Sequence, residues 1–326
     1  MIPGFVDLQV NGYKGVDFSG PNLTLKDIDL VSNQLLAQGT IGYCPTVISS
    51  PLEIYERNLP LIAEAMESKQ RARILGIHLE GPFLNPKYGP RGIHPENQII
   101  SPSIKLFEQF RTWSKDKITL FTLAPEREGA LDLIKHIVNK SKVVVSIGHL
   151  DAGYKTIQEA IDAGARAATH VGNGLADMID RHNNPLWPIL ADDRLSGLFI
   201  TDGSHLPKEM VRVCLRAKGI SNFIVTSDMV HLAGLEPGEY MFHGVPVILE
   251  GKNYLHRKGA TQHAGSASTM LECMNFLASL RELDEKGLYT VGYENPLKLI
   301  DGKIDNLRLK FAPTLKYNGE TFSIRR

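Results

Sequence analysis

Four residues that could do chemistry stand at the ends of short β-branched segments of the sequence. They are Glu80, His149, His170 and Asp228. One carboxylate and two imidazoles can hold a divalent metal ion and leave a fourth position open for water. An aspartate placed opposite can act as general base on that water. The residue types therefore predict metal-assisted hydrolysis, although a strand-end carboxylate can also cap a helix and a lone histidine can be purely structural.

These four residues can meet only if the segments that carry them lie side by side. Short β-branched runs alternate with longer amphipathic segments, and most strand starts are about 25–45 residues apart, the size of a βα unit. The predicted strands are Phe5–Val10, Ile41–Pro45, Ile74–Leu79, Ile118–Leu123, Val143–Ile147, Ala167–His170, Gly197–Ile200 and Phe223–Thr226. The predicted helices are Leu25–Gln38, Pro51–Lys69, Ile104–Lys115, Gly129–Asn139, Thr156–Ala163 and Lys208–Lys218.

Eight strands of this kind predict a (β/α)₈ barrel of the α/β class, in which the carboxyl ends of all strands meet on one face. A doubly wound open sheet is the alternative, but no glycine fingerprint follows any strand to support a nucleotide fold. Residues 80–102 and 229–267 are too long to be simple connections, and we expect them to be functional loops or a hairpin excursion. We expect one barrel over residues 1–300 and a short β-like tail over residues 301–326.

Composition excludes several classes of function. The chain has 36 Lys plus Arg and 36 Asp plus Glu, so its formal charge is zero, which argues against nucleic-acid binding and a polybasic membrane anchor. Cys44, Cys214 and Cys273 are far apart and form no C-x-x-C motif, which fits a reducing compartment. There is no basic segment before the first apolar run and no apolar run of about 18 residues. We therefore expect a cytoplasmic protein.

A set of short motifs occurs in order between about residues 3 and 270. They are Pro3-Gly-Phe-Val-Asp-Leu-Gln-Val-Asn-Gly12, His78-Leu-Glu-Gly-Pro-Phe-Leu84, Gly148-His149, Thr169-His-Val-Gly-Asn173, Asp202-Gly-Ser-His205, Thr226-Ser-Asp228 with Ala233-Gly234, and Gly265-Ser-Ala-Ser268. Together they make the chain resemble the N-acetylglucosamine-6-phosphate deacetylase family of the amidohydrolase superfamily. Any one of them alone would be a weak indication.

The resemblance implies roles at the reacting end of a substrate. Glu80, His149 and His170 match the metal ligands of the family, and Asp228 matches its catalytic acid and base. His94, in Gly92-Ile-His-Pro95, matches a residue that contacts the substrate near its carbonyl group. The implied cofactor is one divalent metal ion, zinc first, with iron(II) or manganese as alternatives.

The resemblance also implies a set of substrate-binding residues. They are Asn173, Gly174, Arg181, His205, Ala264 and Gly265. In the family, the Asn and Gly pair holds the phosphate end of the substrate, and the Arg reaches the phosphate, in some members from the neighbouring subunit. The His contacts the sugar, and the last two residues belong to a loop that lines it. A homodimer is expected on the same grounds.

The sequence departs from the family pattern at three places. Gln9 and Asn11 occupy the positions where many amidohydrolases carry His-x-His for a second metal, and amides are poorer ligands than imidazole, so we expect one tightly held ion. The small β-sandwich that usually precedes the Pro3 segment is expected to be reduced or absent. The segment from Asn173 to Trp187 differs at the substrate end of the site.

The expected reaction is removal of the acetyl group from an N-acetyl amino sugar, above all N-acetylglucosamine 6-phosphate, giving glucosamine 6-phosphate and acetate. One alternative is an amidohydrolase that acts on a different N-acyl compound or a cyclic amide. The other is a non-catalytic sugar-phosphate binding protein on the same scaffold. The presence of Asp228 with all three ligand candidates argues against the second alternative, since binding alone does not need a base aligned on a water.

Overall fold

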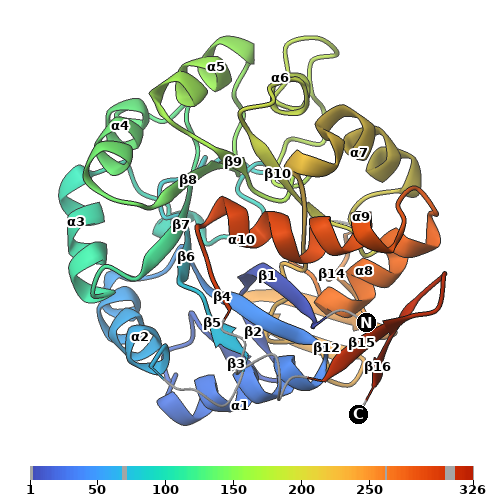
Figure 1. The fold of residues 1–326 in the computed structure, drawn as a ribbon. Helices are drawn as coiled ribbons and strands as arrows, with labels where there is room; N and C mark the ends of the chain where they lie inside the picture. The colour runs from blue at the N-terminus through green and yellow to red at the C-terminus, as the bar shows by residue number, and fades with distance from the viewer. Residues whose placement is uncertain (1–2, 68–71, 261–262, 305–312, 326) are drawn as a thin grey trace.

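A parallel barrel of eight strands, surrounded by helices, forms the centre of the protein (Figure 1). The computed structural model describes residues 3–67, 72–260, 263–304 and 313–325. The barrel strands, in order around the sheet, are β1 (Phe5–Val10), β4 (Thr40–Ile48), β6 (Ile77–Glu80), β7 (Ile118–Leu123), β8 (Val144–Ile147), β9 (Ala167–Ala168), β10 (Ser196–Ile200) and β11 (Phe223–Thr226). The predicted (β/α)₈ barrel is confirmed.

The barrel closes where its first strand meets its last. The backbone N–H of Asn11 donates to the carbonyl oxygen of Met229 at 2.7 Å. In the same seam, Asp7 Oδ1 accepts a hydrogen bond from Thr226 Oγ1 at 2.7 Å and from the backbone N–H of Ser227 at 3.2 Å. Burial raises the pKa of Asp7, while these hydrogen bonds oppose the rise. A buried carboxyl group with several donors thus joins β1 to β11.

The structure divides one predicted strand and shortens another. The run predicted as Ile74–Leu79 is divided into β5 (Arg73–Ile74) and β6, with Gly76 between them at a φ of 154°. A Cβ at Gly76 would lie 1.3 Å from Thr119 Oγ1, so a side chain cannot fit at this division. The strand predicted to reach His170 ends at Ala168, because His170 adopts a φ of 32° and leaves the extended conformation.

Eight helices of the described residues pack around the barrel. They are α1 (Leu25–Ala37), α2 (Leu52–Ala65), α3 (Ile104–Trp113), α4 (Ala130–Lys140), α5 (Tyr154–Ala163), α6 (Leu186–Ala191), α7 (Lys208–Asn222) and α8 (Met270–Ser279). The helix predicted as Pro51–Lys69 ends at Ala65, and the last two of its predicted residues lie outside the described residues. A capping box of Thr24 and Asp27 begins α1. The helices α6 and α8 were not predicted from the sequence, although Thr269 and Glu272 form a second capping box at the start of α8.

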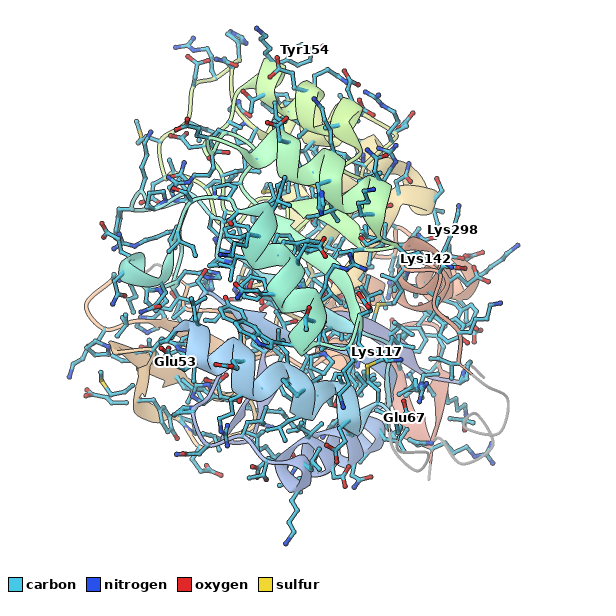
Figure 2. The ribbon with its side chains drawn as sticks, turned by 90° about the vertical axis from the view of Figure 1, so that its left-hand side faces the viewer. Glu53, Glu67, Lys117, Lys142, Tyr154 and Lys298 are labelled. Carbon is cyan, nitrogen blue, oxygen red and sulfur yellow. The ribbon has the colours of Figure 1, made fainter. Side chains whose placement is uncertain are left out.

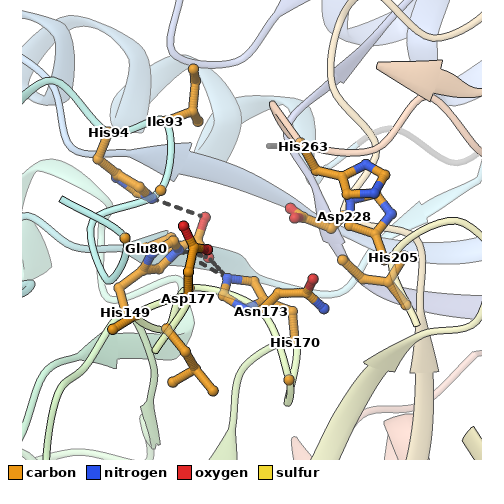
Figure 3. Close-up of a pocket in the computed structure, with 18 of the residues that line it drawn as sticks. Glu80, Ile93, His94, His149, His170, Asn173, Asp177, His205, Asp228 and His263 are labelled. Carbon is orange, nitrogen blue, oxygen red and sulfur yellow. Dashed lines mark hydrogen bonds and ion pairs between the residues drawn. The ribbon is translucent and has the colours of Figure 1, made fainter. Parts of the chain in front are cut away.

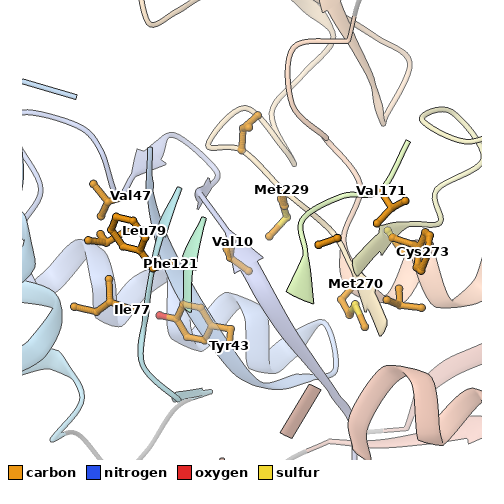
Figure 4. Packing of buried hydrophobic residues seen from close by; sticks show 14 of the residues in the cluster. Val10, Tyr43, Val47, Ile77, Leu79, Phe121, Val171, Met229, Met270 and Cys273 are labelled. Carbon is orange, nitrogen blue, oxygen red and sulfur yellow. The ribbon is translucent and has the colours of Figure 1, made fainter. Parts of the chain in front are cut away.

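The main hydrophobic core fills the space between the strands and these helices (Figure 4). Val47, Ile77, Leu79 and Phe121 are fully buried there. Each such side chain stabilises the fold by about 1.5–3 kcal/mol relative to an exposed one. The core therefore holds the strand ends, and the polar residues that follow them, in fixed positions.

A second, smaller core lies inside the barrel. It combines Val6, Leu8, Leu198 and Ile224 from the strands with Ile300 and the neighbouring Leu297. The latter come from a helical segment of α9 (Glu285–Tyr289), a π-helical turn (Thr290–Glu294) and α10 (Asn295–Leu299), which lies across one end of the barrel (Figure 1). Figure 2 shows Lys298 of α10 at the same end as Lys117 and Lys142, which precede β7 and β8. The segment therefore covers the amino-terminal end of the barrel.

Small antiparallel sheets complete the described structure. Residues 229–267, predicted as a loop or hairpin excursion, contain a three-stranded sheet of β12 (Gly238–Phe242), β13 (Val245–Glu250) and β14 (Tyr254–Arg257). Short strands β2 (Gly12–Tyr13) and β3 (Val16–Asp17) pair after β1. In the tail that was predicted to be β-like, β15 (Thr314–Tyr317) and β16 (Phe322–Arg325) form an antiparallel pair. None of the described helices is long and apolar enough to cross a membrane.

Candidate active site

A cavity of about 600 Å³ lies at the carboxyl-terminal ends of the barrel strands (Figure 3). Most of the predicted site residues line it: Glu80, His94, His149, His170, Asn173, Gly174, His205, Asp228 and Gly265. Ala264 is buried behind this wall rather than part of it. Arg181 is exposed and does not line the cavity within one chain.

The three predicted metal ligands converge at the buried end of the cavity. Their ligand atoms all lie within 4.8 Å of one another. Glu80 Oε1 lies 3.0 Å from His170 Nε2 and 3.3 Å from His149 Nε2, and the two Nε2 atoms lie 2.9 Å apart. All three residues are at most 6% exposed. These residues span 90 positions of the sequence and meet because the carboxyl ends of β6, β8 and β9 converge on one face of the barrel.

The hydrogen bonds around the three ligands favour a cation between them. His149 Nδ1 donates to the carbonyl oxygen of Pro90 at 2.8 Å, so Nε2 of the neutral ring carries a lone pair toward Glu80 and His170. Gln9 Nε2 donates to Glu80 Oε1 at 2.7 Å and fixes the carboxylate. Burial opposes the ionised form of Glu80, but hydrogen bonds and charge from both imidazoles hold its pKa well below the usual range. The donor set is the one expected for zinc or a similar divalent ion.

A network of hydroxyl groups supports the ligands from inside the barrel. Thr122 Oγ1 lies 2.8 Å from His78 Nε2 and 2.7 Å from Thr169 Oγ1, and Thr169 also bonds Ser146 at 2.7 Å. Burial lowers the pKa of His78 to about 4, so this imidazole is neutral at neutral pH. Because these residues sit next to the strand ends that carry the ligands, the network limits how far the ligands can move.

Three of the four strand-end residues have a left-handed backbone. The φ angles of His149, His170 and Asp228 are 52°, 32° and 51°. Residues other than glycine rarely adopt this conformation, which is common where a fold holds a functional side chain. Gly174 approaches the same place at a φ of 63°, and a Cβ there would lie 2.9 Å from His149 Nδ1 and 3.0 Å from His170 Cε1. Only glycine fits between the two imidazoles and the cavity.

Asp228 lines the cavity opposite the metal ligands, as predicted. Asn11 Nδ2 donates to Asp228 Oδ1 at 2.8 Å and so orients the carboxyl group. Burial, together with the negative charge of Glu80, raises the pKa of Asp228 to about 8. A positive charge between Glu80 and Asp228 would favour the ionised form of both groups. Asp228 is therefore placed to exchange a proton with a group bound in the cavity.

His94 reaches the same space from the long segment after β6. The backbone N–H of Ser49 donates to His94 Nδ1 at 3.3 Å, so the proton of the neutral ring is on Nε2. That atom lies 3.7 Å from Glu80 Oε2. Burial, followed by the charge of His149, holds the pKa of His94 well below its usual value. His94 is thus a neutral hydrogen-bond donor directed at the metal-binding end of the cavity.

The other end of the cavity is built from loops and the small sheet. His205 Nδ1 lies 2.8 Å from Asp202 Oδ2, and His263 stacks on the His205 ring. Neither His263 nor Phe242, which also lines the cavity, was predicted from the sequence. The sequences of β13 and β14, on either side of residues 251–253, do not distinguish these strands from a loop. The available signal was that His263 directly precedes Ala264 and Gly265 in the sequence, which were predicted to bind the substrate.

The chain matches the model of the amidohydrolase family over residues 1–292. It is 32% identical to the N-acetylglucosamine-6-phosphate deacetylase of Bos taurus, a match that covers 84% of this chain and 68% of the bovine protein. The enzyme of that name from Caenorhabditis elegans is 33% identical, with the same coverage of both chains. The structure of the Pasteurella multocida N-acetylglucosamine-6-phosphate deacetylase superposes with a TM-score of 0.85 at 27% identity, covering 98% of this chain and 83% of that one. The chain therefore belongs to the amidohydrolase family and, within it, to the N-acetylglucosamine-6-phosphate deacetylase family.

Proposed function

We propose that this protein hydrolyses the acetamido group of N-acetylglucosamine 6-phosphate to give glucosamine 6-phosphate and acetate, using one divalent metal ion. The observation that carries this proposal is the convergence of Glu80, His149 and His170 opposite Asp228 in one cavity. The choice of N-acetylglucosamine 6-phosphate as the substrate rests on the names of the relatives. Zinc is the proposed ion, and iron(II) and manganese suit the same ligands. A metal held by the three ligands would polarise the amide carbonyl and lower the pKa of a water.

The residues of the chain itself have distinct tasks in this reaction. Asp228 accepts a proton from the attacking water, whose oxygen forms a bond to the acetyl carbon. Nε2–H of His94 donates a hydrogen bond to the acetyl oxygen as negative charge develops there. Asp228 then gives its proton to the nitrogen of the departing amino sugar as the C–N bond breaks. The proton thus passes from water to the amine, and Asp228 returns to its initial state.

The sugar is proposed to lie along the rest of the cavity. We assign its binding to Asn173, Gly174, His205 and Gly265, and we assign to Ala264, which is buried and does not itself line the cavity, the task of holding Gly265 in place. The described residues that line the cavity include no Lys or Arg, so a cation for the phosphate has to come from elsewhere. The exposed Arg181 lies in the segment that follows Asn173, and Met178 of the same segment is 91% exposed. We propose that in a homodimer Arg181 reaches the phosphate in the neighbouring subunit.

Two further parts of the proposal concern the whole chain. Residues 1–300 would form the catalytic unit, and residues 301–326 a short appended tail. Cys44, Cys214 and Cys273 are buried free thiols, which supports a cytoplasmic location.

Acetate release tests the reaction. Purified protein is stripped with a chelator, reloaded with zinc, iron(II) or manganese, and assayed on N-acetylglucosamine 6-phosphate, N-acetylglucosamine and a panel of other N-acyl compounds. We expect metal-dependent acetate release that is fastest with the phosphorylated sugar. Turnover of another N-acyl compound alone would favour the alternative amidohydrolase. Binding of the sugar phosphate without any acetate release would favour the non-catalytic alternative.

A further inference from the structure

Two stacked imidazoles form the cavity wall at the end away from the metal ligands. The ring centroids of His205 and His263 are 4.1 Å apart and their planes differ by 27°. Figure 3 shows both rings on the opposite side of the cavity from Glu80 and His149. They come from distant parts of the chain, since His205 follows β10 and His263 follows β14. The stack therefore joins a barrel loop to the small antiparallel sheet.

One nitrogen of His205 is held from behind by Asp202. Asp202 Oδ2 lies 2.8 Å from His205 Nδ1, and Asp202 Oδ1 accepts the backbone N–H groups of Ser204 at 2.8 Å and His205 at 2.9 Å. Burial opposes ionisation of Asp202, but its bonds to His205 lower the pKa of the carboxyl group to about 2. An ionised carboxylate accepts the Nδ1–H, so Nε2 is the nitrogen of His205 left for a ligand. This contact fixes one edge of the ring but leaves its plane free to tilt.

His263 restrains the face of the same ring. Its Nε2–H donates to the carbonyl oxygen of Ser204 at 3.1 Å. The Tyr254 ring packs edge-on against it, with centroids 5.2 Å apart. Burial, followed by the charge of His205, lowers the pKa of His263 to about 4. His263 is therefore neutral at neutral pH and can stack on His205 without repulsion between charges.

We propose that His263 is a positioning residue, which holds the plane of the His205 ring so that Nε2 meets an oxygen of the sugar substrate. The identity of that substrate rests on the proposed function. The described cavity lining offers no Lys or Arg, so within one chain the sugar has to be recognised by neutral polar groups such as the imidazole of His205. His263 makes this contribution without touching the reacting amide.

The test compares His263→Ala with His263→Phe. Alanine removes the stacked ring, whereas phenylalanine keeps a neutral ring face and loses only the bond to Ser204. For N-acetylglucosamine 6-phosphate we expect His263→Ala to raise KM about three- to tenfold with kcat nearly unchanged. We expect the KM of His263→Phe to lie much closer to that of the wild type. His256→Phe is the matched control, because His256 lies on the same small sheet and stacks on Tyr254 but does not line the cavity.

An alanine variant with wild-type KM would overturn the proposal, as would an equal increase of KM in the alanine and phenylalanine variants. A fall of kcat with unchanged KM would overturn it too, because the effect would then be on the chemistry. The crystal structure of metal-loaded His263→Ala gives a readout that needs no substrate. We expect the His205 ring to be tilted or to have two conformers in this variant, but a single conformer in His263→Phe. If the wild-type protein releases no acetate, the proposed function fails while this structural test still decides the role of His263.

Discussion

The two ends of the cavity are built in different ways. At the metal end, Glu80, His149 and His170 lie at or just after the carboxyl ends of barrel strands and are almost fully buried, and hydrogen bonds orient Glu80 and His149. At the sugar end, the wall consists of the segment around Asn173, which is half-buried to exposed, and of residues near the small antiparallel sheet. The strand ends thus determine the chemistry, while segments that can change without disturbing the barrel determine the substrate.

The strongest test of the metal end is the removal of its acid and base. Asp228→Asn keeps the shape of the side chain and its bond with Asn11, but it cannot carry a proton between water and amine. We expect kcat to fall about 10²–10⁴-fold. Metal content by mass spectrometry should stay near one ion per chain. A variant within a few-fold of wild type would show that another group moves the proton.

Gly174 connects the two ends and offers a test of how closely they are coupled. In Gly174→Ala, a Cβ would press against His149 and His170, and the backbone would keep a φ that alanine disfavours. We expect metal affinity to fall about 10–100-fold, as after loss of an outer-shell partner. A competition assay with a chelator of known affinity measures the change. Unchanged affinity would mean that the segment after His170 can move without moving the ligands.

Arg181 tests the sugar end. If its guanidinium binds the phosphate, Arg181→Ala should raise KM for N-acetylglucosamine 6-phosphate about 10–100-fold with a smaller change in kcat, because binding is lost equally from ground state and transition state. The KM for N-acetylglucosamine should hardly change. Equal losses with both sugars would mean that Arg181 is structural.

A mixing experiment asks which subunit Arg181 serves. Chains with Arg181→Ala and chains with Asp228→Asn are combined under conditions that exchange subunits. If Arg181 reaches across a dimer, each hybrid contains one site with both residues intact, and activity should recover in part. No recovery in verified hybrid dimers would place Arg181 in its own subunit's site.

The smallest expected effect concerns the stability provided by Asp202. The pKa of Asp202 is about 2 in the folded protein and 3.8 when unperturbed, so the unfolded state binds more protons as the pH falls through this range. Its contribution of about 2 kcal/mol should be present above pH 4 and lost between about pH 4 and pH 2. Urea unfolding at several pH values checks this. The stability difference between wild type and Asp202→Asn should shrink over that range, and a constant difference would contradict the assignment.

The metal end was predictable from sequence because its signals are local. A β-branched run followed by Glu80, His149 or Asp228 identifies a strand and the residue at its end, and the barrel brings the ends together. The strand boundaries were less certain where the backbone turns, as at Gly76 and His170. The strand predicted as Ala167–His170 was found, but the sequence did not show that β9 has only two residues.

The sugar end was harder to predict for physical reasons. The stack of His205 on His263 depends on the fold of the small sheet, whose strands alternate too weakly to be distinguished from a loop. At the metal end, the contact between Asn11 and Asp228 was equally hidden, because it joins residues 217 positions apart. The family resemblance singled out His205 and Gly265, but it gave no reason to select the imidazole beside them.

The helical segment across the amino-terminal end of the barrel bears on the order in which products leave. That end is covered by α10 and filled by Leu8, Leu198 and their neighbours. Substrate and products therefore pass through the opening of the cavity at the carboxyl-terminal end. The acetyl group reacts at the deep, buried end, with the sugar between it and solvent. We therefore expect the amino sugar to depart first and acetate last. In steady-state inhibition, acetate would then compete with the substrate, whereas glucosamine 6-phosphate would inhibit noncompetitively.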